Sequence, residues 1–217
     1  MIKAVVLDMD GTMFDTERLC AEGWKKAGEV LGCGNVMELI EQAMGVSAAA
    51  ERELFLTKYG PDFPFDEFRK ISADYSKDYI QKNGVPVKEG LTELLDYLKR
   101  EGYKIAVATS SSRSSTMSHF ERTKLTGYFD QIICGDMLEK SKPDPDIYLK
   151  AAQALQVSPQ ECMALEDSPN GIFSAYRAGM KTVMIPDTVP SNPELEKMLF
   201  ACVPTLHGVI QLLKNWE

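Results

Sequence analysis

The stretch "VVLDMDGTMFDTE", from Val5 to Glu17, carries four acidic side chains on and just after a short apolar run. Two of them, Asp8 and Asp10, stand where the apolar run ends. A continuous apolar run is typical of a strand in a parallel sheet that is covered on both faces. Two carboxylates so close together repel each other when both are ionised, unless a positive charge or a shared proton intervenes. The stretch therefore predicts a buried strand ending in an acid pair that needs a partner.

Four more apolar runs share this pattern, and together the five predicted strands are Ala4–Asp8, Lys104–Ser110, Gln131–Gly135, Cys162–Asp167 and Thr182–Pro186. Helical spacing of apolar residues separates the last four, with helices predicted over Glu89–Gly102, Asp144–Gln156 and Ser168–Gly179 and from Arg113 onward. Strands that alternate with helices indicate an α/β fold built on a doubly wound parallel sheet.

The alternation breaks between the first two strands, where residues 15–83 show only helical patterns separated by turn signals. We expect an α/β core made of residues 1–14 and 84–217, with residues 15–83 inserted as an all-helical domain. The alternative is that these helices lie on a face of the sheet.

Composition narrows the classes of partner. The chain has 217 residues and a formal net charge of −8, so it repels a nucleic-acid backbone and suits a small-molecule substrate. No apolar run approaches the ~20 residues of a membrane span, and the first residues do not resemble a secretory signal. The five cysteines form no CxxC pair, which favours reduced thiols. We expect a cytoplasmic protein, and a monomer by default.

Reactive side chains gather where the predicted strands end, which in open parallel sheets is the edge that binds ligands. These are Asp8 and Asp10 after the first strand, Thr109 and Ser110 at the second, Lys140 and Lys142 after the third, and Glu166 and Asp167 at the fourth. Four acids at one edge need a counter-charge, and a hard divalent cation with oxygen ligands, Mg²⁺ best of all, supplies it. A cation and Lys142 would together receive a phosphoryl group.

Four segments resemble, in order, the four motifs of the haloacid dehalogenase superfamily: "DMDGT" at Asp8–Thr12, "VATSSS" at Val107–Ser112, "KSKPDPDIY" at Lys140–Tyr148 and "LEDSPNGIFSAYRAG" at Leu165–Gly179. The resemblance implies a Rossmann-like core, a helical cap, a required Mg²⁺ and the chemistry of a phosphoric monoester hydrolase that forms an aspartyl-phosphate. The inserted helices stand where that cap occurs, and Gly90 stands at the return into the core.

The same resemblance assigns roles to individual residues. Asp8 would be the nucleophile and a metal ligand, and Asp10 the general acid/base whose main-chain carbonyl also binds the metal. Thr109 and Ser110 would bind the phosphoryl group, and Lys142 would stabilise its charge and restrain Asp8. The remaining metal ligands would be Asp167 and, directly or through water, Glu166. Gly11 and Thr12 would begin a mobile flap.

Within the superfamily the pattern is similar to the β-phosphoglucomutase-like group, which contains both mutases and phosphatases. The mutases carry a His where this chain has Cys20, and an Arg where it has Ala48. Both departures favour a phosphatase acting on a small phosphomonoester, such as a sugar phosphate, with a phosphomutase as the alternative. A receiver-like signalling module is disfavoured by the helical insertion, and a C–Cl dehalogenase by the presence of Asp10.

Several residues beside these motifs have structural interpretations. Asp15 and Glu17 suit the first turn of a helix that Thr16 would cap, although Glu17 and Asp15 also stand where a substrate could reach them. Asp144 and Ser168 are positioned to cap the helices that follow them.

Overall fold

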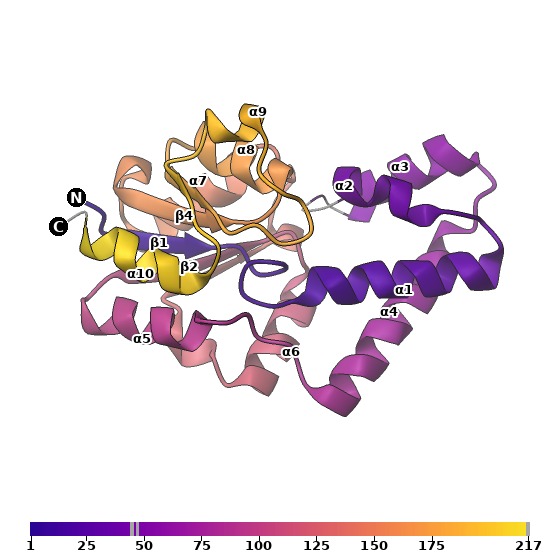
Figure 1. The fold of residues 1–217 in the computed structure, drawn as a ribbon, viewed down its shortest axis with the longest axis horizontal. Helices are drawn as coiled ribbons and strands as arrows, with labels where there is room; N and C mark the ends of the chain where they lie inside the picture. Colours follow the sequence, from indigo (N-terminus) through magenta and orange to yellow (C-terminus); the bar gives the residue numbers. More distant parts are fainter. Residues whose placement is uncertain (44–45, 47, 216–217) are drawn as a thin grey trace.

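The computed structural model describes residues 1–43, 46 and 48–215. Its core is a sheet with the strand order β3-β2-β1-β4-β5-β6, in which every neighbouring pair is parallel (Figure 1). The strands are β1 Ala4–Leu7, β2 Lys104–Thr109, β3 Gln131–Cys134, β4 Cys162–Glu166, β5 Lys181–Met184 and β6 Ala201–Cys202. The five predicted strands are confirmed, and β6 is an addition whose two residues are too few to show a periodicity.

Helices cover both faces of the sheet because successive strand residues point to opposite sides. Val5 and Leu7 pack on one face with α5 (Leu91–Arg100), α6 (Arg113–Thr123) and α10 (Leu206–Lys214). Ala4 and Val6 pack on the other with α7 (Asp146–Leu155) and α8 (Pro169–Arg177). The short α9 (Pro193–Glu196) extends that second layer through Leu195, which packs with Ile172 and Met184. The doubly wound α/β prediction is confirmed.

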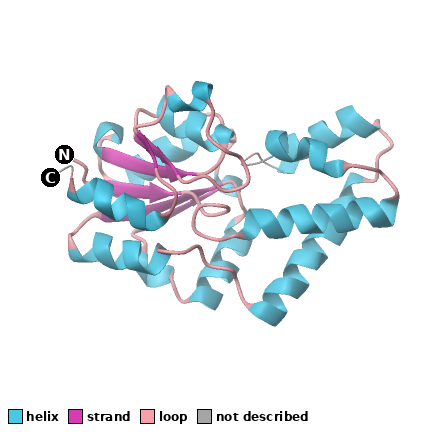
Figure 2. Cartoon of the chain, in the orientation of Figure 1, coloured by secondary structure: helices cyan, strands magenta, loops and turns pink. Residues whose placement is uncertain are grey.

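The chain between β1 and α5 is all helical in the part that the structure describes (Figure 2). It contains α1 (Thr16–Leu31), a 3-10 turn (Val36–Leu39), α2 (Ile40–Ala43), α3 (Ala48–Tyr59) and α4 (Phe65–Asn83). These helices have a core of their own, in which the Trp24 ring meets Phe55 edge-on at 4.9 Å and Phe68 at 5.8 Å. A separate core shows that the helices form an inserted domain, and the alternative that they lie on the sheet is wrong.

Two chain segments connect the helical insertion to the sheet, one on the way out and one on the way back, and they lie side by side. Asp15 N–H donates to the Pro86 carbonyl at 2.9 Å, and Lys88 N–H donates to the Met13 carbonyl at 2.9 Å. Gly90, with φ of +86°, begins α5 where the chain returns. The paired segments set how the insertion faces the carboxyl end of the sheet.

Two remaining expectations concern cysteines and membranes. Cys134 and Cys162 are buried in the core, whereas Cys202 is exposed. None of the helices in the described part of the chain combines the length and the apolar character of a membrane span.

Candidate active site

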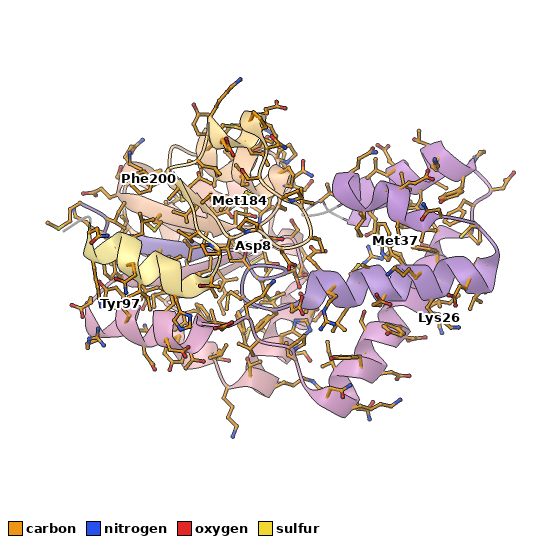
Figure 3. The ribbon with its side chains drawn as sticks, in the orientation of Figure 1. Asp8, Lys26, Met37, Tyr97, Met184 and Phe200 are labelled. Atoms are coloured by element: carbon orange, nitrogen blue, oxygen red, sulfur yellow. The ribbon has the colours of Figure 1, made fainter. Side chains whose placement is uncertain are left out.

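The carboxyl ends of β1, β2 and β4 bring the predicted site residues together. Because Leu7 pairs with both Val107 and Leu165, Asp8 lies level with the last residues of the two neighbouring strands. Asp8 stands at the end of the sheet that faces the helical insertion (Figure 3). The sequence argument from strand ends therefore predicted which side chains meet at this edge of the sheet.

Lys142 is the buried cation of the site, with its side chain only 1% exposed. Its ammonium group donates to Asp8 Oδ1 at 2.5 Å, to Glu166 Oε1 at 2.6 Å and to the Ala108 carbonyl at 3.1 Å. Burial alone would lower the pKa of Lys142, but the charges of Asp8 and Glu166 raise it above its ordinary value. Lys142 therefore stays charged and restrains Asp8.

Glu166 is fully buried and surrounded by donors. Its Oε1 accepts from Lys142 and from the Tyr148 hydroxyl at 2.5 Å, and its Oε2 accepts from the Ser168 hydroxyl at 3.2 Å. The Asp167 and Ser168 N–H groups donate to Oε2 as well, at 3.3 and 3.4 Å. These donors hold Glu166 against Lys142.

Asp8, Glu166 and Asp167 form a candidate cation site, because each can offer an oxygen within 4.8 Å of the others. Burial, followed by the neighbouring carboxylates, raises the pKa of Asp167 well above its usual range. Burial likewise raises the pKa of Asp8, although Lys142 opposes the shift. Lys142 neutralises one of the three charges, so the oxygen set fits a hard divalent cation.

Gly11 and Thr12 hold Asp167 from the other side. The Thr12 hydroxyl donates to Asp167 Oδ1 at 3.0 Å, and Thr12 is fully buried. Gly11 has φ of +87°, and a Cβ there would lie 2.1 Å from Asp167 Oδ2. Only glycine fits both the backbone angle and this close approach.

Asp10 lies outside that cluster and is bound by hydroxyl groups. Thr16 donates to its Oδ1 at 2.6 Å, and Ser111 and Thr109 donate to its Oδ2 at 2.7 and 3.4 Å. The prediction that Thr16 caps the first insertion helix is wrong, because its hydroxyl reaches Asp10 instead. Ser111 is a site residue that sequence reasoning did not single out, although it stands in the quoted "VATSSS".

Ser168 caps its helix as predicted, whereas Asp144 stands one residue before Pro145, which is the N-cap of α7. The Ser168 hydroxyl accepts from Gly171 N–H at 3.1 Å and so caps α8, while it also donates to Glu166. Asp144 Oδ1 accepts from Asp146 N–H at 3.2 Å at the start of α7. Gly171 is needed at this point, because a Cβ there would lie 1.9 Å from Glu166 Oε1.

A cavity of about 530 Å³ separates the insertion from the sheet end. Its floor includes Asp8, Asp10, Thr109 and Ser110, and its upper wall includes Glu17, Cys20, Trp24, Ala48, Glu51 and Arg69. Burial raises the pKa of the Cys20 thiol well above its usual range, and Glu17 and Glu51 raise it further. Cys20 is therefore a neutral thiol at physiological pH. Gly45 and Ser47, which stand shortly before Ala48 in the sequence, lie outside the residues that the structure describes.

Comparison with known proteins assigns the family. The sequence model of the haloacid dehalogenase-like hydrolases matches residues 5–185, and this chain belongs to that family. A phosphorylated carbohydrates phosphatase of Thermotoga maritima is 29% identical, over 84% of each chain. A β-phosphoglucomutase of Bacillus subtilis is 32% identical, over 84% of this chain and 82% of its own. The crystal structure of CbbY from Rhodobacter sphaeroides in complex with phosphate superposes with a TM-score of 0.79 at 26% identity, covering 95% of both chains.

Proposed function

We propose that this hydrolase is a Mg²⁺-dependent phosphatase that cleaves a small phosphomonoester, such as a sugar phosphate, through an aspartyl-phosphate on Asp8. The observation that carries the proposal is the position of Asp8 on the cavity floor, with Lys142 bonded to its Oδ1 and Asp10 two residues away among hydroxyl donors. The phosphatase relative in Thermotoga maritima supports the same reaction class.

The first half of the reaction forms the covalent intermediate. An oxygen of Asp8 attacks phosphorus, and the bond from phosphorus to the ester oxygen breaks. Because Oδ1 is bound by Lys142, Oδ2 is the oxygen available to attack. Asp10 donates its proton to the departing oxygen, so the leaving group departs as a neutral alcohol.

The second half returns the enzyme to its starting state. Asp10, now ionised, accepts a proton from water while the water oxygen attacks phosphorus, and the bond from Asp8 to phosphorus breaks to release inorganic phosphate. The hydroxyl groups of Thr16 and Ser111 hold Asp10 in position for both transfers. Thr16 is the first residue of α1 in the insertion, so the position of Asp10 also depends on how the insertion is placed against the sheet.

The phosphoryl group is bound by Thr109, Ser110 and Lys142. Thr109 and Ser110 line the cavity floor, and the nearby ammonium group offsets the negative charge that the phosphate brings. Gly135 allows the chain after β3 to approach the chain after β2 closely, since a Cβ on it would lie 2.3 Å from the Ser110 carbonyl oxygen.

The residues that would hold Mg²⁺ are Asp8, Asp167, the main-chain carbonyl of Asp10 and, through water, Glu166. When bound, the cation would neutralise charge on the phosphate and the carboxylates. The carboxyls of Asp8 and Asp167, whose pKa values burial raises, would then be ionised in the working enzyme.

Excess EDTA is expected to abolish the hydrolysis of p-nitrophenyl phosphate, and excess Mg²⁺ to restore it. Ca²⁺ should restore little, because it prefers longer bonds and a looser geometry. A readout that needs no turnover is thermal unfolding, in which Mg²⁺ should raise the Tm of the wild type but not of Asp167→Asn. Full activity in excess EDTA, or an equal rise in Tm in both proteins, would contradict the metal assignment.

A phosphomutase is the second candidate, favoured by the 32% identity to the β-phosphoglucomutase of Bacillus subtilis. Against it stand Cys20 and Ala48, which line the cavity and provide neither a base at neutral pH nor a positive charge. β-Glucose 1-phosphate is therefore expected to yield free phosphate, measured by a phosphate-release assay. Accumulation of glucose 6-phosphate instead would establish the mutase.

A further inference from the structure

The wall of the cavity that comes from the helical insertion carries charges that the proposed chemistry does not use. Glu51 of α3 is only 15% exposed and forms an ion pair of 3.2 Å with Arg69 of α4. Glu17 of α1 is half-buried, and burial and then the charges of Asp10 and Asp8 raise its pKa. Both glutamates line the same cavity.

The charge balance of this cavity is one-sided. Of the described residues that line it, five are acidic and one, Arg69, is basic: the acids are Asp8, Asp10, Glu17, Glu51 and Asp136. Arg69 is already paired with Glu51. A second anionic group on a substrate would therefore face carboxylates on the insertion wall without an unpaired cation among the described lining residues.

The wall suits a neutral group with hydroxyls much better. Carboxylates accept hydrogen bonds from hydroxyl groups, and such charged acceptors form the stronger bonds. Trp24 forms an apolar part of the same wall, and its ring packs edge-on against Phe55 and Phe68. At about 530 Å³ the cavity falls within the ~300–1,000 Å³ range of small-molecule sites.

We propose that the enzyme selects phosphomonoesters whose non-reacting end is uncharged and bears hydroxyl groups, and that Glu17 and Glu51 enforce this choice. The two carboxyl groups bond to the substrate hydroxyls, and Glu51 holds Arg69, the one basic residue among the described lining residues, away from a second phosphate or carboxylate. Arg69 positions Glu51 and favours its ionised form, although burial raises the pKa of Glu51 above its usual range. This selection rests on the proposed phosphatase function, since it concerns the part of the substrate that leaves as the alcohol.

The test compares fructose 6-phosphate with fructose 1,6-bisphosphate, which differ by one anionic group. The wild type is expected to show a kcat/KM for the monophosphate that is higher by roughly tenfold or more, because the second phosphate of the bisphosphate finds no unpaired cation among the described lining residues. Glu17→Gln combined with Glu51→Gln should reduce this ratio by about tenfold, chiefly through a lower KM for the bisphosphate, since Arg69 is then free to bind it.

Glu53→Gln is the matched control. Glu53 is an exposed residue of the same helix and is not part of this cavity's wall, so its replacement should leave the ratio unchanged. The single variant Glu51→Gln, which also frees Arg69, provides a second, smaller shift of the ratio if the double variant folds poorly, as judged by circular dichroism.

Each failure has its own signature. If the wild type hydrolyses the bisphosphate as well as the monophosphate, or if neither glutamine variant changes the ratio, the selection is wrong while the phosphatase function stands. If no phosphate is released from p-nitrophenyl phosphate, which carries no second anionic group, the phosphatase function itself is wrong.

Discussion

Asp8→Asn is expected to reduce the hydrolysis of p-nitrophenyl phosphate by roughly 10⁴-fold or more, an effect comparable to removing a nucleophile from other enzymes. The amide nitrogen of Asn cannot attack phosphorus, and the amide oxygen is a poor nucleophile. The amide oxygen can still accept the bond that Lys142 now donates to Asp8 Oδ1, so the local packing is preserved.

The stability of this variant should equal or exceed that of the wild type in the absence of metal. The pKa of Asp8 is raised on folding, so its ionised form costs stability at every pH above the unfolded pKa. The neutral Asn removes that cost. Activity should be measured together with thermal unfolding, using Asp78→Asn on the exposed surface of α4 as the control. Turnover of Asp8→Asn at the wild-type rate would rule out the assignment of the nucleophile.

Lys142→Met is expected to lower the free energy of unfolding by about 3–5 kcal/mol, as when one partner of a buried ion pair is removed. The variant leaves Asp8 and Glu166 buried beside each other without the ammonium group that now bonds to both. Activity should fall as well, because the same group restrains Asp8 and receives the phosphate. Urea unfolding gives the stability, and p-nitrophenyl phosphate hydrolysis the activity.

The loss of stability should shrink at acidic pH. Lys142 lowers the pKa of Asp8, so its removal raises that already elevated pKa further. An acid whose pKa is raised by folding stabilises the folded protein at low pH, and this stabilisation is lost as the pH rises. The variant is therefore least destabilised where Asp8 is protonated. Lys140→Met is the matched control, since Lys140 is 65% exposed and its 3.4 Å pair with Asp144 is worth at most about 1 kcal/mol. Equal losses in the two variants would contradict the stabilising role given to the buried Lys142 ion pairs.

Sequence reasoning succeeded where local patterns decide the outcome. Continuous apolar runs identify buried parallel strands, and the carboxyl ends of parallel strands share one edge of the sheet. The positions of Asp8, Thr109 and Glu166 relative to those runs were therefore enough to predict that they meet. The missing strand pattern over residues 15–83 likewise predicted the helical insertion.

Other features depend on packing between distant segments, which no local pattern reveals. The bond from Ser111 to Asp10 joins residues 101 positions apart, and that from Tyr148 to Glu166 joins residues 18 apart. The Glu51–Arg69 pair exists because α3 and α4 fold against each other in the insertion.

The sequence by itself thus determined the α/β class, the inserted helices and the strand ends at which the reactive side chains stand. Apolar periodicity and strand termini are local properties of the chain, so they can be read without the fold. Only the tertiary structure decided which donors surround Glu166 and which charges line the cavity. It also decided that the Thr16 hydroxyl bonds to Asp10 instead of capping a helix. Those contacts depend on how whole elements pack, because a side chain's partners are set by its neighbours in space.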